Sequence, residues 1–593
     1  MEQIFTNKNL TVNYLMDRIR MGKLGLPELQ RPFVWKDTKV RDLFDSMLKG
    51  YPVGYLMLWE CGESTHKKKA IGTDTKDNSP VEVIIDGQQR LTSLYAVIKG
   101  QKVIDENYRE REIIISYSPI NNEFKVGDAS TKNSPEWIYN ISNLFTLESM
   151  FDYISRFREA LSERNLSPKE LTCITKRIEA LYNLKDYDFP VFVLNAEAGE
   201  DDVSETFMRI NSQGVNLNEV DFILTLLSVH WEEGRKQLDA FCRESFTPNT
   251  STVTSYNSIG ITIQPRHIIR TSIAYAFNRG RLEYGRKMLK GDDLKTRGLK
   301  EDIMKQNLAT LKGKLSEVMN VNNWHEFLKS VMGAGYLTDS MILSMNAVYY
   351  TYAMYLIAKD RFHAPNNANK DLASLWFFHA VMTAMYSNSP ESVAESHLNA
   401  IARLSTFEDY RQFIISRVSE RLTDDFFSVT LPGYDGLAKS GSGNNAWYAY
   451  VASLNILGTK VLFSHSSLTV SSLFTLGTDG TRKSLEKHHL FPKAYLKKRG
   501  YLDTEINQMA NYALIYWNDN ASVLDEAPSV YYPKVCKGLS DEEILQMESE
   551  NALPHSWENM SYEDFLVQRR KLMAQIIKQS FIILRDKASQ FPN

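Results

Sequence analysis

The sequence predicts a multidomain α+β protein with a mixed α/β N-terminal domain, a helical middle domain and a small mixed C-terminal domain. Three observations lead to this prediction. The chain has 593 residues, which is more than one hydrophobic core usually organises. Its apolar residues alternate between strand-like and helix-like patterns near the N-terminus, and keep helical spacing in the middle. A segment rich in Gly, Ser and Asn then precedes a last, mixed part.

The N-terminal domain is predicted from helices that alternate with short strands. Apolar residues recur at helical spacing after Asp37, the expected N-cap, until Gly50 ends the pattern. The run Val81–Asp86 predicts a buried strand, Gly87 permits a sharp turn, and Gln88–Lys99 again carries apolar residues at helical spacing. This region therefore predicts a strand, a turn and a helix in direct succession.

The middle of the chain is predicted to be helical, because apolar residues keep helical spacing from about Val203 to Ser428. Beyond it, Pro432–Asn445 is rich in Gly, Ser and Asn, which is typical of a linker. A terminal helix is predicted from near Ser561. The predicted boundaries are residues 1–202 for the N-terminal domain, 203–431 for the helical domain, 432–446 for the linker and 447–593 for the C-terminal domain.

Composition points to a cytoplasmic protein and neither supports nor excludes DNA binding. The formal net charge is −3, from 69 basic and 72 acidic residues, so nucleic acid would have to bind local patches. The four cysteines form no CxxC pair, which argues against a zinc ribbon and against a disulfide-stapled secreted domain. The N-terminus has neither the basic start nor the apolar core of a signal peptide.

One stretch has to be weighed as a membrane span, because Met341–Ala358 contains no charged residue. It also contains Ser344, Asn346, Thr351 and four tyrosines. These polar groups favour a helix buried in the protein, so no membrane partner is expected.

Three polar motifs stand out in the N-terminal part: LPELQRPFVW, IIDGQQRLTSL and FMRINSQGVNL. In the second, Asp86 ends the predicted strand, and the next polar residues open a helix, where free N–H groups and the helix dipole favour an anion such as phosphate. Arg90 can bind phosphate oxygens in a bidentate manner. Asp86 can hold a metal or position water, and Gln89 can orient that water.

The same residues have a structural interpretation. Asp86 would cap the helix, while the glutamines and Arg90 would form buried polar bonds that hold one loop on another. The DGQQR string is not a Walker A loop and contains no GK[ST] sequence. The pattern alone leaves both interpretations open.

Taken together, the motifs resemble the ParB-like N-terminal domain of GmrSD-type modification-dependent restriction endonucleases. The matching sets, in family order, are Gln30-Arg31 with Trp35, then Asp86 to Arg90, then Arg209, Asn211 and Gly214 with Asp221. The resemblance implies a nucleotide-hydrolysing and regulatory module, with GTP, ATP and UTP left open as its nucleotide. The implied pocket for a nucleotide or a nucleic-acid backbone is lined by Asp86, Gly87, Gln88, Gln89, Arg90, Gln30, Arg31, Arg209 and Asn211.

The segment EKHHLFPKAYLKKRG places His488 and His489 before a turn and a basic run. Hydrolysis of a phosphodiester needs a base for water, a divalent cation for the developing charge and a residue that orients the base. An HNH nuclease shows acid-His-x-x-Pro followed by asparagines, so His489 matches the base and Pro492 the proline. Asn511 would tie the intervening loop, and Asn520 matches the later asparagine.

These residues also have an alternative interpretation, because a histidine pair can form a surface turn and asparagines are common in turns. The segment Lys487–Lys534 is nevertheless similar to the C-terminal nuclease domain of the same restriction enzymes and of SspE-like phage-defence proteins. The resemblance implies a ββα-metal HNH nuclease domain with flanking helices. It implies as catalytic residues His489, His488, Asn520 and Asn511.

The predicted cation site departs from the usual pattern, because His488 stands where most HNH domains have Asp or Glu. Imidazole suits transition metals better than Mg²⁺, so Mg²⁺, Mn²⁺ and other transition metals all stay open. The predicted ligands are His488 and Asn520, and Asp525 is a candidate for the third.

Basic residues cluster near the histidines, and the predicted DNA contacts are Lys493, Lys497, Lys498 and Lys534. A second stretch, Arg266–Lys300, holds ten Lys and Arg residues and has the composition of a DNA channel. For both clusters the alternative is a solvated surface.

The leading hypothesis is a cytoplasmic defence endonuclease, in which a nucleotide-binding or DNA-sensing N-terminal domain controls an HNH nuclease that cuts modified phage DNA. The rival is a non-catalytic DNA-binding or regulatory protein with a decayed HNH site, and a further alternative is an NTPase alone. The sequence leaves open the DNA modification, the choice between nicking and double-strand cleavage, and the oligomeric state, including a homodimer.

Overall fold

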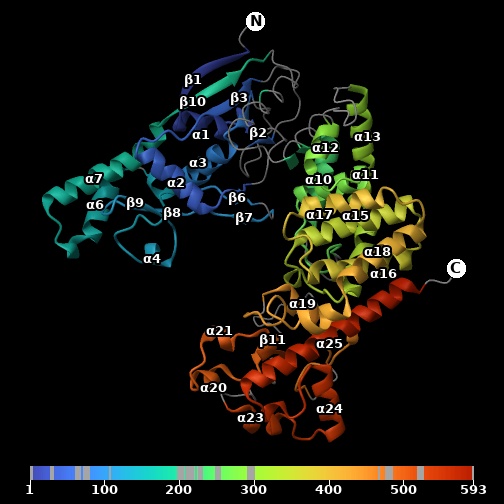
Figure 1. Cartoon of the computed structure of the whole chain (residues 1–593). Coiled ribbons are helices and arrows are strands. Elements are labelled where there is room, and N and C mark those ends of the chain that lie inside the picture. The colour runs from blue at the N-terminus through green and yellow to red at the C-terminus, as the bar shows by residue number, and fades with distance from the viewer. Residues whose placement is uncertain are drawn as a thin grey trace. The chain divides into compact units, whose positions relative to one another are not determined.

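The structure is a computed structural model that divides the chain into two compact units, Met1–Arg235 and Lys236–Asn593 (Figure 1). The described residues are 4–26, 33–60, 69–70, 81–105, 108–147, 149–196, 206, 219–220, 223–224, 227, 231–246, 255–289, 301–441, 443–464, 468–474, 485–516 and 526–590. Unit 1 combines a β-sheet with helices, and unit 2 is mainly helical. Each unit has buried side chains of its own. The chain is therefore multidomain and of mixed α and β structure, as predicted.

Unit 1 contains a six-stranded mixed sheet. The strand order is β1 (Phe5–Thr11), β10 (Asp188–Leu194), β3 (Leu56–Glu60), β5 (Glu82–Asp86), β2 (Leu24–Leu26) and β4 (Lys69–Ala70). The β10–β3 and β2–β5 pairs are parallel, and the β1–β10, β3–β5 and β2–β4 pairs are antiparallel. The register of β3 on β5 shifts between Met57 and Leu58, which places an irregularity beside the end of β5.

The predicted strand, turn and helix at the DGQQR motif are confirmed. Strand β5 ends at Asp86, Gly87 has φ +91°, and helix α3 spans Gln88–Lys99. One face of the sheet packs on α1 (Val12–Arg20), α2 (Asp37–Leu48) and α3 to form the main core of the unit. Asp37 is the first residue of α2 and not its cap, since Lys36 holds that position.

Short hairpins and further helices complete unit 1. They are β6 (Val103–Ile104), β7 (Glu110–Arg111), β8 (Ile115–Ser118), β9 (Glu123–Val126), α4 (Ala129–Lys132), α5 (Ser142–Phe145), α6 (Met150–Ala160) and α7 (Pro168–Tyr182). Among the described helices, α10 (Glu232–Glu244) crosses the division between the units.

The first part of unit 2 is helical, as predicted. Its helices are α11 (Pro265–Phe277), α12 (Leu282–Leu289), α13 (Glu301–Val318), α14 (Val321–Gly333), α15 (Met345–Arg361), α16 (Asn366–Met382), α17 (Pro390–Ile401) and α18 (Phe407–Arg421). Helix α15 is buried on all sides from Ala347 to Ala358. Three of its tyrosine hydroxyls donate to backbone carbonyls, from Tyr349 to Thr262, from Tyr350 to Gly280 and from Tyr352 to Val318.

The stretch weighed as a membrane span is thus a core helix, and its polar groups are satisfied inside the protein. Over the described part of the chain, no helix combines the length and apolar character that crossing a membrane requires.

The second part of unit 2 contains a β-ribbon and more helices. Its elements are α19 (Asn445–Leu457), β11 (Leu485–His489), α20 (Lys493–Lys497), α21 (Asp503–Ile506), β12 (Tyr512–Tyr516), α23 (Pro528–Val535), α24 (Asp541–Glu550) and α25 (Tyr562–Ser589). Ser561 caps α25 by accepting a hydrogen bond from the Asp564 N–H, so the terminal helix begins where it was predicted. Helix α25 packs against both α16 and α19. The segments predicted as helical domain and C-terminal domain therefore lie within one compact unit.

Candidate functional site

The histidine pair ends a two-stranded antiparallel ribbon, β11 with β12. His489 lies opposite Tyr512, and His488 lies opposite Ala513. Helix α20 begins directly after Pro492, whose fixed backbone geometry suits the start of a helix. The short connection from His489 to α20 therefore brings a strand end, a sharp turn and a helix start together (Figure 1).

Asn511 ties this turn to the start of β12. Its Oδ1 accepts a hydrogen bond from the Phe491 N–H at 2.8 Å, and its Nδ2 donates to the carbonyls of Phe491 and Ile506, both at 3.1 Å. The side chain is fully buried. Both amide N–H groups are used inside the protein, so Asn511 acts on the site through the turn that it holds.

A second residue holds the backbone around Asn511, and the sequence did not single it out. Arg569 of α25 is fully buried, and its Nη1 donates to the carbonyls of Ala510 and Tyr512, both at 2.8 Å. These carbonyls flank Asn511 on either side. A signal was present in the sequence, because Arg569 stands four residues from both Phe565 and Met573, on the apolar face of the helix.

His489 is half-buried and contacts two polar neighbours. Its Nε2 lies 3.0 Å from Asn507 Oδ1, and its ring centroid lies 4.7 Å from that of Tyr512. Tyr512 donates its hydroxyl hydrogen to the same Asn507 oxygen at 3.1 Å. Burial lowers the pKa of His489 below its ordinary value, and the hydrogen bond to Asn507 opposes this effect in part. Burial thus favours the neutral ring, which is the state a general base requires.

His488 leaves the ribbon on the other face, because successive residues of a strand point to opposite sides. Its ring meets that of Tyr531 edge-on, with centroids 6.5 Å apart. Asn520 and Asp525, the other predicted cation ligands, lie outside the described residues. Within the described residues, no three or more His, Cys, Asp or Glu side chains gather in a way that could hold a metal ion. His488 is thus the one predicted ligand whose surroundings are known.

The DGQQR motif forms a second polar cluster, in unit 1. Arg90 donates from Nη1 to the Val53 carbonyl at 2.9 Å, and its Nη2 lies 3.4 Å from Asp86 Oδ2. Gln89 Oε1 accepts the Val34 N–H at 3.0 Å. These bonds hold two neighbouring loops on the start of α3, as the structural interpretation of the motif expected.

The expected capping role of Asp86 is wrong. The N-cap of α3 is Gly87, no side chain caps that helix, and the Asp86 carboxylate faces Arg90 instead. Gly87 is required for two reasons: its φ of +91° suits glycine, and a Cβ there would lie 2.4 Å from Leu56 Cδ2. The other predicted pocket residues, Gln30, Arg31, Arg209 and Asn211, lie outside the described residues.

The fold of unit 1 and its motif cluster can be compared with known proteins. Residues 12–228 match the GmrSD restriction endonuclease N-terminal domain. A curated protein of Methanocaldococcus jannaschii, described as uncharacterized, is 20% identical over 634 aligned residues, which cover 99% of this chain and 98% of the relative. The similarity to this relative extends along nearly the whole chain, but its description gives no function.

The GmrSD match covers nearly all of unit 1, including the sheet strands from β2 to β10 and the whole DGQQR cluster. It also spans all three polar motifs that carried the resemblance in the sequence. The histidine ribbon lies outside the residues matched to the GmrSD domain. Its interpretation therefore rests on its own geometry.

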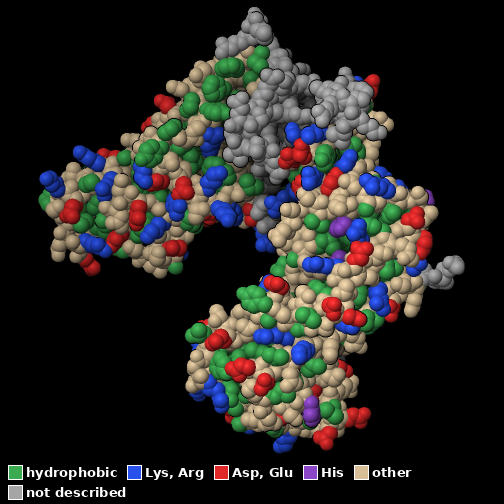
Figure 2. Space-filling model, viewed as in Figure 1, with side chains coloured by type: hydrophobic (Ala, Val, Ile, Leu, Met, Phe, Trp, Pro, Cys, Tyr) green, Lys and Arg blue, Asp and Glu red, His purple; other side chains and the backbone are tan. Residues whose placement is uncertain are grey.

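The predicted DNA-contact lysines are exposed and partly paired with acids. Lys493 and Lys497 both reach Asp503 Oδ1, at 3.1 and 3.2 Å, and Lys534 pairs with Glu526 at 2.6 Å. Ion pairs between such exposed side chains contribute little, so the lysines stay available to phosphate groups. Figure 2 shows Lys and Arg interspersed with Asp and Glu on the visible face, in agreement with the small net charge.

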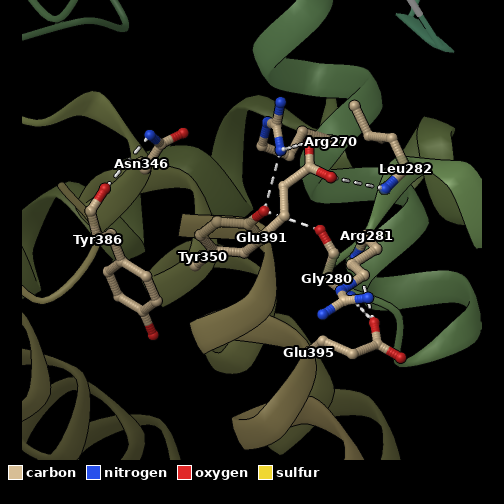
Figure 3. A network of polar contacts seen from close by, with 9 residues as sticks. All are labelled: Arg270, Gly280, Arg281, Leu282, Asn346, Tyr350, Tyr386, Glu391 and Glu395. Carbon is tan, nitrogen blue, oxygen red and sulfur yellow. Dashed lines mark hydrogen bonds and ion pairs between the residues drawn. The ribbon is translucent and has the colours of Figure 1, made fainter. Parts of the chain in front are cut away.

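The second basic stretch, Arg266–Lys300, is described as far as residue 289, and its arginines mainly serve packing. Arg270 donates to Glu391 at 2.7 Å and to the Tyr350 hydroxyl at 3.0 Å. Arg279 donates to Glu395 at 2.8 Å. The backbone N–H groups of Gly280 and Leu282 also donate to Glu395 and Glu391 (Figure 3). Together these contacts attach α11 and the start of α12 to α17. Three side-chain bonds of this kind favour a structural role for this stretch over a DNA channel.

Proposed function

We propose that this chain is a DNA endonuclease of the restriction type, whose C-terminal part hydrolyses phosphodiester bonds with His489 as the base. The observation that carries the proposal is the setting of His489, a half-buried imidazole at the end of β11 that lies beside the turn held by Asn511. The GmrSD match of residues 12–228 supports DNA as the substrate, because that domain is described as part of a restriction endonuclease.

The reaction would begin when a water molecule gives a proton to the free nitrogen of His489. The water oxygen then attacks the phosphorus atom of the DNA backbone, the bond from phosphorus to the leaving sugar oxygen breaks, and that oxygen takes up a proton from solvent water. Asn511 keeps the turn after His489 in place during these steps, and Arg569 holds the backbone on both sides of Asn511. Exposed Lys493, Lys497, Lys498 and Lys534 would contact backbone phosphates near the cut.

A divalent cation is part of the proposal, with Mg²⁺, Mn²⁺ and other transition metals as candidates. His488 and Asn520 would hold it, and when bound it would stabilise the negative charge that develops on the phosphate. An imidazole ligand favours a transition metal.

For unit 1 we propose a regulatory role, in which the DGQQR cluster binds a nucleotide or a DNA backbone and controls cutting. The Asp86–Arg90 pair is only partly buried, with 26% and 18% of the two side chains exposed, so a ligand can reach the pair and place an anionic group on Arg90. An Arg90→Ala variant tests the nucleotide assignment against Arg156→Ala, a control at an exposed position of α6. Unchanged turnover of GTP, ATP and UTP in folded Arg90→Ala protein would contradict it.

The target that fits a restriction enzyme is foreign DNA in the cytoplasm, and the resemblance to modification-dependent enzymes points to modified phage DNA. Homodimer formation is compatible with this proposal. The decisive experiment incubates the full chain with modified phage DNA and matched unmodified DNA. EDTA, Mg²⁺, Mn²⁺, Ni²⁺ and Zn²⁺ are compared, each with and without nucleotide.

The proposal predicts cutting that needs a cation, disappears in EDTA and prefers modified DNA. No cutting in any arm favours the rival, a non-catalytic DNA-binding or regulatory protein with a decayed nuclease site. The observation behind the rival is His488, which replaces the usual acid and packs edge-on against Tyr531. Nucleotide turnover without cutting would instead indicate an NTPase alone.

A further inference from the structure

The ring of His489 has two nitrogen atoms, and in its neutral form one carries a hydrogen while the other can accept a proton. Which nitrogen is free depends on the hydrogen bond that the other one makes. Among the described residues, the side chain of Asn507 lies within hydrogen-bonding distance of that ring, with Oδ1 at 3.0 Å from Nε2.

We propose that Asn507 is a positioning residue that selects the tautomer of His489 with the hydrogen on Nε2, which leaves Nδ1 free to accept a proton. This inference rests on the proposed role of His489 as the base. Asn507 itself touches no reacting atom in this account, and acts through the ring that it orients.

The bonding of Asn507 Oδ1 supports this tautomer. A carbonyl oxygen accepts hydrogen bonds and cannot donate one, and it can serve two donors at once. The Tyr512 hydroxyl occupies one acceptor position of Oδ1 at 3.1 Å, and His489 Nε2 occupies the other. With Oδ1 as acceptor, Nε2 has to carry the hydrogen.

The backbone of Asn507 is held from two directions. Its carbonyl accepts the Gly441 N–H at 2.6 Å and the Ser440 hydroxyl at 3.3 Å, and its own N–H donates to the Asp503 carbonyl at 3.0 Å. Ser440 also forms an isolated antiparallel bridge with Gln508. The segment predicted as a linker thus fixes the residue that holds His489. Because Asn507 is itself held in place, it keeps the His489 ring oriented before substrate binds.

Asn507 differs from Asn511 in what its side chain holds. The Asn511 amide bonds three backbone groups and so stabilises the turn itself. The Asn507 amide, within the described residues, contacts two side chains, those of His489 and Tyr512. Removal of the Asn507 amide should therefore change the state of the ring more than the stability of the fold.

The test compares wild type with Asn507→Ala, with Asn507→Asp, which keeps an acceptor oxygen, and with Asn559→Ala as the control at an exposed asparagine of the same unit. The first readout is the tautomer of His489, from nitrogen NMR of histidine-labelled protein at a pH where the ring is neutral. The His489→Ala protein identifies the signal. The second readout is kcat and KM for DNA cleavage.

We expect the Nε2–H form in wild type, Asn507→Asp and the control, and its loss as the single form in Asn507→Ala. We also expect kcat to fall about 10- to 100-fold in Asn507→Ala, a range typical of residues that orient a functional histidine. KM should stay within about twofold, and Asn507→Asp should recover most of kcat. The Nδ1–H form in wild type, or an unchanged ring and kcat in folded Asn507→Ala, overturns the inference.

The two readouts separate this inference from the proposed function. The NMR measurement needs no DNA cleavage. If the chain cuts no DNA yet shows the Asn507-dependent Nε2–H form, the proposed endonuclease function is contradicted and the role of Asn507 is supported. A chain that cuts DNA with His489 in the Nδ1–H form contradicts the role of Asn507 alone.

Discussion

Asn511 and Phe491 are joined by two reciprocal hydrogen bonds across the turn that follows β11. The Phe491 N–H donates to Asn511 Oδ1 at 2.8 Å, and Asn511 Nδ2 donates to the Phe491 carbonyl at 3.1 Å. The pair links two positions twenty residues apart, directly beside His489. The geometry of the candidate base therefore depends on an asparagine that is itself fully buried.

The first prediction concerns this pair. In Asn511→Ala, the buried groups of Phe491 and Ile506 lose their partner, and a buried unsatisfied group costs about 1–3 kcal/mol. We expect the free energy of unfolding to fall by about 3 kcal/mol, measured by urea denaturation with tryptophan fluorescence. The exposed control Asn559→Ala should stay within about 0.5 kcal/mol of wild type. Equal free energies of unfolding for the two variants would show that the hydrogen bonds of the Asn511 side chain do not stabilise the fold.

Gly280 and Gly313 should respond to alanine in opposite directions. A Cβ on Gly280 would lie 2.2 Å from the Glu395 nitrogen and 2.6 Å from the Ala394 carbonyl carbon, both in the backbone of α17. It would disturb the contacts of Figure 3, in which Glu395 Oε2 accepts the Gly280 N–H at 2.7 Å. A Cβ on Gly313, within α13, meets nothing within 4 Å.

We expect Gly280→Ala to destabilise unit 2 by about 1–3 kcal/mol. Gly313→Ala should stabilise it by roughly 0.5–1 kcal/mol, because alanine is the better helix residue. Differential scanning calorimetry measures both. Two shifts of the same sign would show that Gly280, in the turn before α12, is not in tight contact with α17.

Buried histidines should make unit 2 sensitive to acid. Burial lowers the pKa of His379 to about 3, of His267 to about 3 and of His397 to about 4, from an ordinary value of 6.5. In the unfolded chain these rings take up protons below pH 6.5, whereas in the folded chain they stay neutral until pH 3 to 4. The stability they contribute is therefore constant above pH 6.5 and lost as the pH falls from 6.5 towards 3.

Below pH 6.5, and above its pKa in the folded chain, each of these histidines should lower the free energy of unfolding by about 1.4 kcal/mol per pH unit. Thermal unfolding between pH 7.5 and 4.5 measures the slope. His379→Leu should lower this slope by about 1.4 kcal/mol per pH unit, the contribution of one proton, since the His379 side chain is 3% exposed. An unaltered slope in His379→Leu would mean that the ring is already protonated in the folded chain.

DNA binding should show a charge contribution from Lys497. Its pairing with Asp503 is exposed, so the lysine can exchange a carboxylate for a phosphate. Lys497→Ala should weaken binding to all DNA sequences alike and lower the salt-dependence slope by about one. Fluorescence anisotropy at several salt concentrations measures this, with Lys571→Ala on α25 as the control. An unchanged salt-dependence slope in Lys497→Ala would show that Lys497 does not contact DNA phosphates.

Local features of the fold could be predicted from the sequence. The strand at Val81–Asp86, the turn at Gly87 and helix α3 follow from short-range periodicity and from one glycine, and the structure confirms all three. The buried character of Met341–Ala358 was also predictable, because its tyrosines need partners that a protein core supplies. These features depend on neighbours in sequence.

The partners of the candidate site could not be predicted in the same way. Asn507 reaches His489 from 18 residues away, Arg569 reaches Ala510 from 59 residues away, and Gly441, within the predicted linker, donates its N–H to the Asn507 carbonyl. Such contacts depend on how helices and strands pack in three dimensions, and the spacing of apolar residues along the sequence does not indicate them. The error at Asp86 has a related cause, since the Arg90 guanidinium, one turn along the helix, competes for its carboxylate with the free N–H groups of α3.

The central claim is that His489 is the base of a DNA-cutting reaction. The most direct test compares the cleavage rate of modified phage DNA by wild type, by His489→Ala and by His555→Ala, a matched histidine with 78% of its side chain exposed in the same unit. Loss of a general base typically costs about 10²- to 10⁴-fold in rate. The account predicts such a loss for His489→Ala, with unchanged DNA affinity, and a wild-type rate for His555→Ala. Cleavage at the wild-type rate by folded His489→Ala protein would contradict it.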